Sequence, residues 1–288
     1  KIYGEEHDVD ICIKCSGNLE YCVSCEVRFI KDITRCELCR SGVCNNCMER
    51  HECRAETPNH LLQHVNTNAI RGDIALAKDM VSDRLIGIEF ECVNGNPEKI
   101  GRLGKGVGIS RDGSLKGKHP IEIQTPPLSA NKLEEYIDNI TSVVKKAGYG
   151  VNVSCGVHIH LDGNNIRCEE LIKLIKVYYA VEPLILAMLP ESRKNNRYAL
   201  PLKNWIDESV FVKLDNIMDM QELEAMWYKA RNDTDLLDSK DNHYDSSRYH
   251  GFNLHSFFVH NNIEMRYHHG TLNPIKIKNW INLHILLF

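Results

Sequence analysis

The sequence predicts an α+β protein: a curved, largely antiparallel sheet with helices packed on one side, preceded by a small zinc-stabilised module. Three observations predict this architecture. Four CxxC pairs crowd the first 55 residues. Further along, strand patterns alternate with helix patterns, and several neighbouring strands are joined by short turns typical of antiparallel pairs. In those strands, charged residues occupy one face and apolar residues the other, which favours a sheet with one covered face.

Composition limits the function classes. The chain has 288 residues, a formal net charge of −4 and 43% hydrophobic residues. This length suits one large domain and a small module, and the charge gives no reason to expect nucleic acid as a partner. The longest apolar run, "VYYAVEPLILAML", is interrupted by Glu182 and Pro183 and is too short to span a bilayer. No signal peptide is visible. We therefore expect a cytoplasmic protein that does not bind membranes.

The cysteine-rich front, residues 1–55, is interpreted as a zinc module. CxxC is the spacing that lets two thiolates reach one tetrahedral zinc, so four pairs suit two structural Zn2+ sites. The alternative is a secreted disulfide framework, which the lack of a signal peptide and the scattered later cysteines disfavour. Spacing leaves the pairing order open, sequential or interleaved as in a RING-like cross-brace. The eight predicted ligands are Cys12, Cys15, Cys22, Cys25, Cys36, Cys39, Cys44 and Cys47.

A linker over residues 56–83 follows, with a connecting helix expected at 70–80, and residues 84–288 form the large domain. Strands are expected at 84–93, 106–113, 120–127, 151–162, 248–259 and 263–268, the last two flanking the turn "HNN". Helices are expected at 131–147, 169–188, near 221–230 and from about 274. The first of these begins with a capping-box-like pair, Asn131 and Glu134, and ends at Gly148.

The stretch "CGVHIHLDG" places His158 and His160 two residues apart, so in a strand both point to one face. A solvent-facing strand with two imidazoles is the simplest interpretation. The same alternation predicts that the other face packs on the core; its residues are Val151, Val153, Cys155, Val157, Ile159 and Leu161.

Other strands add carboxylates to the face that carries the histidines. These side chains are Glu89 and Glu91 in "GIEFEC", Glu122 beside Gln124 in "IEIQ", and Glu264 beside Arg266 in "IEMRYH". Four carboxylates facing one cavity would repel each other and take up protons unless a cation lay among them. Oxygen ligands with one imidazole suit Mg2+ or Mn2+, and an arginine beside them suits a phosphate.

Six motifs then carry a family resemblance. In order, they are "GIEFE", "RDGSL…IEIQTPPL", "CGVHIHLD", "ESRKNNRYALPL", "RYHGFNL" and "IEMRYHHGTLNPIKIKNW". With this order and spacing, residues 84–288 resemble the amidoligase family of the glutamine synthetase and glutamate–cysteine ligase-like superfamily of carboxylate–amine ligases. The cysteine-rich front lies outside the common core. The resemblance implies a glutamine synthetase-like catalytic fold and an ATP-dependent ligase that joins a carboxylate to an amine through an acyl phosphate.

The resemblance also implies roles for individual residues. Glu89, His158 and Glu264 match ligands of the Mg2+ or Mn2+ nearer the ATP phosphates. Glu91 and Glu122 match ligands of the metal nearer the carboxylate, with Asp112 or a water as a third. His160 and Arg266 match catalytic groups that contact the phosphates of ATP. Arg248 is a further catalytic candidate, and Arg193 and Arg197 are candidates for cofactor binding.

Two other functions compete with the ligase. A zinc-dependent hydrolase could use the HxH pair with the glutamates, but it leaves the arginines unexplained. A RING-like interaction adaptor would use the large domain as a platform only. The sequence does not identify the carboxylate or the amine, which are small molecules or belong to a protein or peptide recruited by the zinc module. It does not fix the oligomeric state.

Overall fold

The computed structural model describes residues 2–4, 7–8, 20–21, 28–29, 33–35, 42–48, 59–67, 84–194, 196–229, 241–242 and 245–288. No helix within these ranges is both long and apolar enough to cross a membrane.

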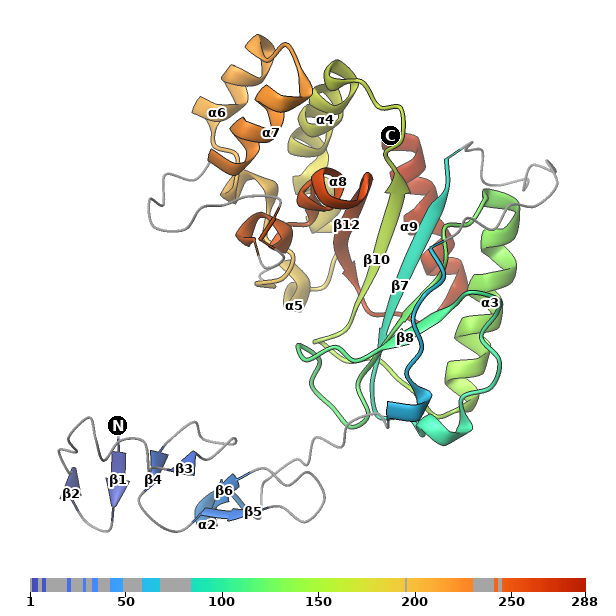
Figure 1. Ribbon diagram of the computed structural model, residues 1–288, viewed down its shortest axis with the longest axis vertical. Coiled ribbons are helices and arrows are strands. Elements are labelled where there is room, and N and C mark those ends of the chain that lie inside the picture. Colours follow the sequence, from blue (N-terminus) through green and yellow to red (C-terminus); the bar gives the residue numbers. More distant parts are fainter. Residues whose placement is uncertain are drawn as a thin grey trace.

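The large part of the chain is built on an open six-stranded sheet, ordered β11-β12-β10-β7-β9-β8, in which every neighbouring pair is antiparallel (Figure 1). The strands are β7 (Ile86–Cys92), β8 (Gly108–Ser110), β9 (Ile121–Gln124), β10 (Gly156–Asp162), β11 (Phe252–Asn253) and β12 (Asn262–His269). The predicted α+β class with an antiparallel sheet is confirmed. The long strands β7 and β10 lie side by side at the centre, so residues at mid-strand are held rigidly.

Three helices share the hydrophobic core with the apolar face of the sheet: α3 (Ala130–Lys146), α4 (Cys168–Ala187) and α9 (Pro274–Leu287). Ile88 and Phe90 of β7 are 1% exposed, and Leu133 of α3 and Ile281 of α9 are fully buried in the same core. Burial of this face stabilises the domain, because each large aliphatic side chain removed from water contributes about 1.5–3 kcal/mol.

Helices are not confined to that face, contrary to the sequence prediction. The short helix α8 (His255–His260) contributes Ser256 and His260 to the cavities over the polar face of the sheet. Residues 255–259 were expected to continue a strand, so β11 is much shorter than predicted. The helix ends at Asn261, which adopts the left-handed conformation with φ of 54° and turns the chain directly into β12.

The remaining elements of the large part are short. They are α5 (Glu191–Lys194), α6 (Glu208–Lys213), α7 (Met220–Lys229) and the 3-10 helices η2 (Pro97–Lys99), η3 (Leu202–Asn204), η4 (Leu214–Asn216) and η5 (Ser246–Tyr249).

The described residues of the front form two small sheets. One has the order β2-β1-β4-β3, with β1 (Ile2–Gly4), β2 (His7–Asp8), β3 (Glu20–Tyr21) and β4 (Arg28–Phe29). The other pairs β5 (Ile33–Arg35) with β6 (Gly42–Cys44), followed by α2 (Asn45–Met48); η1 (Asn59–Leu61) comes next. Six of the eight predicted zinc ligands, and the expected helix at 70–80, lie outside the described residues. The module and its boundaries therefore stay predictions.

The strand with the two histidines begins at Gly156, five residues later than expected. Val151 and Val153 are 38% and 71% exposed, so the alternation in this stretch is not that of a buried strand. The Asn152 side chain accepts hydrogen bonds from the Ser154 backbone N–H and hydroxyl and thereby forms a local turn. The start of α3 also differs from the prediction. Ser129 is the residue that precedes the helix, and Asn131, the predicted first residue of the capping box, lies inside it.

A bulge in β12 separates its two halves. Ile159 pairs with Met265, but Val157 pairs with His268, so two β12 residues stand opposite His158. The bulge shifts the side-chain alternation by one residue. Arg266, two residues after Glu264, shares the polar face with it. Beyond the bulge, Tyr267 and His268 are both buried.

Candidate active site

The antiparallel register brings the predicted site residues together at the centre of the sheet. In β7, Glu89 stands opposite His158 on one side and Gln124 on the other. Glu91, two residues further, stands opposite Glu122. On the far side of β10, His160 stands opposite Glu264 of β12. Four strands thus supply one continuous polar surface.

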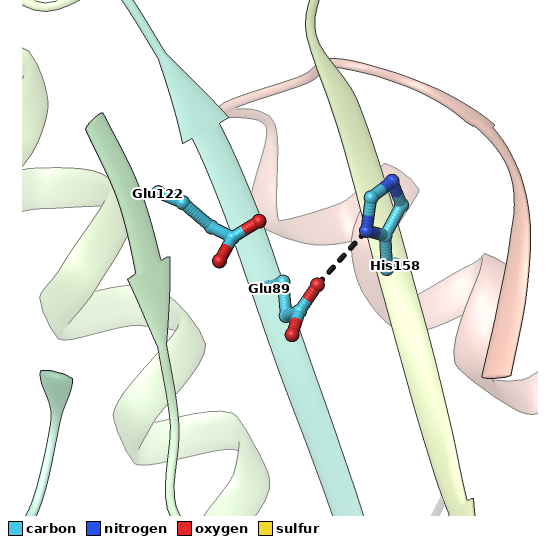
Figure 2. Close-up of side chains that lie close together, drawn as sticks. All are labelled: Glu89, Glu122 and His158. Carbon is cyan, nitrogen blue, oxygen red and sulfur yellow. Dashed lines mark hydrogen bonds and ion pairs between the residues drawn. The ribbon is translucent and has the colours of Figure 1, made fainter. Parts of the chain in front are cut away.

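Glu89 lies between the two histidines. Its Oε2 is 2.9 Å from His158 Nδ1, and its Oε1 is 3.4 Å from His160 Nε2. Figure 2 shows the Glu89 and Glu122 carboxylates and the His158 ring pointing toward one another from adjacent strands. His158 also lies 3.3 Å from Glu264 and 3.5 Å from Glu91, so this single ring faces three carboxylates.

Glu264 is held by two neighbours besides the histidines. Its Oε1 accepts a hydrogen bond of 2.6 Å from Arg266, and its Oε2 accepts one of 2.5 Å from the Asn253 amide. Arg266 is oriented in turn, because its Nε donates to the Tyr198 carbonyl at 3.1 Å. A carboxylate fixed through both oxygens is preorganised for a ligand.

Gln124 and Asp112 complete the other end of the surface. The Gln124 amide donates to Glu122 at 2.7 Å and to Glu89 at 3.3 Å, so it bridges two carboxylates. Ligand atoms of three side chains approach within 4.8 Å of one another in each of three clusters: Glu89, Glu122 and His158; Glu89, His160 and Glu264; and Glu91, Asp112 and Glu122. The third cluster contains Asp112, the third ligand that the sequence left open.

The pKa shifts show the mutual repulsion of these carboxylates. Burial and the charges of its carboxylate neighbours raise the pKa of Glu122 well above its ordinary value, and burial raises that of Glu91. Burial opposes ionisation of Glu89 as well, but the neighbouring histidines hold its pKa well below the ordinary value. Although burial alone would lower the pKa of His160, Glu89 raises it to about 9. In the metal-free protein, protons on these side chains therefore offset part of the negative charge that a bound cation would neutralise.

His160 provides a direct test of whether a cation fits. Its Nδ1 lies 2.8 Å from the Asn262 Oδ1, a bond in which the ring nitrogen donates. The buried Nε2 is then directed toward Glu89 and makes no hydrogen bond within the described part of the chain. A ring that donates from one nitrogen while the other faces carboxylates is the arrangement of a metal-binding histidine. The residues present fit a divalent cation.

The other three predicted site arginines lie in different surroundings. Arg248 lines the larger cavity over the sheet. Arg193 is buried, and it donates to the backbone carbonyls of Tyr267 and Arg266. Arg197 stacks on the Tyr198 ring, 4.7 Å from its centroid, and does not line either cavity described next.

Two cavities meet at Glu89 and His160. The larger, of about 760 Å3, is lined by charged residues that include Arg111, Asp112, Arg248 and Arg266. The smaller, of about 430 Å3, combines apolar and uncharged residues, among them Val65, Leu85, Thr125 and Pro127, with Glu89, His160 and Asp162. Both volumes lie in the range of small-molecule sites.

Sequence reasoning missed the amides that orient the site. Asn253 donates a hydrogen bond to Glu264, and Asn262 accepts one from His160. Their positions in "GFNL" and "HNN", next to the predicted strands, were the signal in the sequence that could have identified them. Tyr198 holds Arg266 through its backbone carbonyl, which no residue type can signal.

Comparison with curated proteins yields no match. The model of one protein family, described as "Putative amidoligase enzyme", matches residues 102–287. The matched segment includes β8 through β12 and thus Glu122, His158, His160, Glu264 and Arg266; β7 with Glu89 and Glu91 precedes it. Because the match covers well over half of the chain, the protein belongs to the putative amidoligase family.

Proposed function

We propose that this protein is an ATP-dependent ligase that joins a carboxylate to an amine through an acyl-phosphate intermediate. One observation carries the proposal: oxygen-rich ligand clusters lie where two cavities meet, the smaller with Val65, Leu85 and Pro127 in its wall and the larger lined by charged residues. The family implies amide-bond formation, and the arrangement supports ATP as the energy source. The nucleoside end of ATP would enter the smaller cavity, and the carboxylate and amine the larger one.

The carboxylate clusters would hold Mg2+ or Mn2+. Each cluster contains at most one histidine and otherwise carboxylates, a donor set that suits these hard cations better than Zn2+. This composition disfavours the zinc-dependent hydrolase. When bound, the cations would neutralise charge on the phosphates and on the transferred phosphoryl group.

The chain's own residues have definable tasks in the reaction. Oxygen of the substrate carboxylate attacks the terminal phosphorus of ATP, the bond to the bridging oxygen breaks, and ADP leaves. Arg266, fixed by Glu264 and Tyr198, would stabilise charge on the group in transfer, since a planar guanidinium contacts two oxygens at once. Arg248 would orient the substrate carboxylate.

In the second step the amine nitrogen attacks the acyl carbon, the bond to the phosphate oxygen breaks, and phosphate leaves. The amine must lose a proton as the amide forms. The departing phosphate can accept this proton.

The cysteine-rich front would bind two structural Zn2+ and recruit a protein or peptide substrate. Four CxxC pairs saturate two tetrahedral sites and leave no open position for catalysis. In the described residues, Cys44 ends β6 and Cys47 lies in α2, so the last pair spans a strand-to-helix junction.

The test is incubation of the protein, ATP and Mg2+ with pools of candidate carboxylic acids and amines, followed by mass spectrometry. We expect a product with the mass of acid plus amine less one water, formed together with ADP and phosphate. The Glu89→Gln variant should form none. A product that forms without ATP, or AMP in place of ADP, would contradict the proposal.

A further inference from the structure

Residues 59–67, which we call the strap, pack against the outer edge of the large sheet. The strap begins with η1 and then pairs with β8 at a single antiparallel bridge between Gln63 and Ile109. Two backbone hydrogen bonds of 3.0 and 2.8 Å join these residues, and Asn66 donates to the Gly106 carbonyl at 2.8 Å. Figure 1 shows the strap in blue beside the sheet. It covers backbone groups that an edge strand would leave open.

Two glycines let the strap approach this closely. A Cβ on Gly108 would lie 2.5 Å from the Val65 backbone nitrogen, and one on Gly106 would lie 3.0 Å from the Asn66 Cβ. Because the obstructing atom at Gly108 belongs to the backbone, a side chain there could not be accommodated by a rotamer change. The close packing of the strap on β8 thus depends on Gly108.

The strap also forms one wall of the smaller cavity. Val65 and Thr67 line it together with Leu85 and Pro127, and Glu89 and His160 line the same cavity. His64, which directly precedes Val65, is exposed and does not line the cavity. The strap, like β7, lies outside the matched segment 102–287.

We infer that the strap is a specificity element of the nucleotide site, with Val65 and Thr67 in contact with the nucleoside end of ATP. The inference rests on the proposed function. An apolar wall suits a flat base, and the charged end of the same cavity suits the phosphates. The consequence is that residues 59–67, part of the sequence between the cysteine-rich front and the large domain, belong to the active site.

The experiment measures binding of a non-hydrolysable ATP analogue with Mg2+ to the full chain by calorimetry. Val65→Glu places a carboxylate in the cavity wall and should weaken binding about tenfold or more. His64→Glu is the matched control, with the same charge one residue away, and should bind as the wild type does. Gly108→Ala should weaken binding as well, because it displaces the strap. Thermal melting of each variant verifies that the large domain is folded.

The outcomes separate the two proposals. If the wild type does not bind the analogue, the proposed function fails and the inference fails with it. If the wild type binds and Val65→Glu binds equally well, the inference alone is wrong. The inference is also overturned if Val65→Glu leaves nucleotide binding intact but raises the KM of the carboxylate substrate, because the smaller cavity then serves the other substrate.

Discussion

Glu91 of β7 and Glu122 of β9 are direct cross-strand partners on the same face of the sheet. Like charges in this position destabilise a sheet, and here Asp112 brings a third carboxylate within 4.8 Å. Burial strengthens the repulsion because water no longer screens it. An arrangement that costs stability in the free protein is explained if a divalent cation binds there.

Replacement of one member of this pair should therefore have opposite effects with and without metal. Glu122→Gln removes a charge whose raised pKa reports an unfavourable environment, so the metal-free protein should gain on the order of 1 kcal/mol in stability. The same change should reduce the rise in Tm that Mg2+ or Mn2+ causes, since a ligand is lost. Differential scanning calorimetry measures both.

Glu135→Gln, at an exposed position on α3, is the control and should change neither quantity. The cation account is contradicted if Glu122→Gln lowers the metal-free Tm and retains the full metal-induced shift.

Asn262 should act through His160 and not on substrate. Its Oδ1 accepts hydrogen bonds of 2.8 Å from both His160 Nδ1 and the Ser256 hydroxyl, so it fixes the orientation of the ring. Asn262→Leu should weaken Mn2+ binding about 10- to 100-fold. In the metal-free protein, nitrogen-15 NMR of the histidine ring should show a lower pKa for His160, because the hydrogen bond to Asn262 that helps to raise this pKa is lost.

Asn261→Gly provides the matched control for Asn262→Leu. Asn261 has φ of 54°, a conformation that glycine adopts readily, so the turn should be retained. If Asn262→Leu leaves the NMR spectrum of His160 unchanged, Asn262 has only a structural role.

Arg266 should contribute more to phosphoryl transfer than to ATP binding in the ground state. Arg266→Lys keeps the charge and loses the planar fork, so kcat should fall about 10- to 100-fold with a smaller change in the KM for ATP. Arg197→Lys makes the same substitution on an exposed arginine that does not line either cavity, and should have little effect. A rise in KM alone for Arg266→Lys would show that the residue is a uniform binder of ATP.

Buried His284 should make stability depend on pH in the acid range. Burial lowers its pKa to about 3, while the unfolded chain protonates at about 6.5. Below pH 6.5 the unfolded state therefore binds more protons than the folded state, and stability falls as the pH falls toward 3, by up to about 1.4 kcal/mol per pH unit.

His284→Gln should flatten this dependence between pH 6.5 and 4 in urea unfolding, although its stability at pH 8 is lower because hydrogen bonds to Tyr178 and His268 change. His64→Gln, at an exposed position, is the control and should keep the wild-type slope. A slope in His284→Gln equal to that of the wild type would contradict the assignment.

The cysteine-rich front should contain close to two zinc ions per chain by elemental analysis. Cys36→Ser combined with Cys39→Ser should release zinc and unfold this segment, because metal supplies its stability. ATP hydrolysis by the large domain should persist in this variant, whereas ligation to a protein substrate should be lost. Full ligation by the zinc-free variant would contradict the recruitment role.

The polar face of the sheet was predictable because its signal is local. In "GIEFEC", "IEIQ" and "GVHIHLD", residues two apart share a face, and a one-residue error would place carboxylates in the core. The family's motifs supplied the rest of the ligand list. The helices α3, α4, α7 and α9 were predictable for the same reason, since each has a sustained apolar pattern of its own.

What could not be predicted depends on tertiary context. The stretch "HSFFVH" has strand-forming residues but folds as α8, because β11 ends at Asn253, Asn261 caps the helix, and the helix packs beside β12. Likewise, nothing local identifies the bulge that separates Arg266 from the buried His268, or the contact of the strap with Gly108. Valines at 151 and 153 show the converse, a strand pattern overridden by one side-chain turn at Asn152.

The central claim is that an acyl phosphate forms between the carboxylate substrate and the terminal phosphate of ATP. The most direct test uses the acid substrate labelled with oxygen-18 in both oxygens of its carboxyl group. Mass spectrometry then measures the label in the phosphate that the reaction releases. The account predicts one labelled oxygen in the phosphate for each amide formed. Unlabelled phosphate alongside amide formation would contradict it.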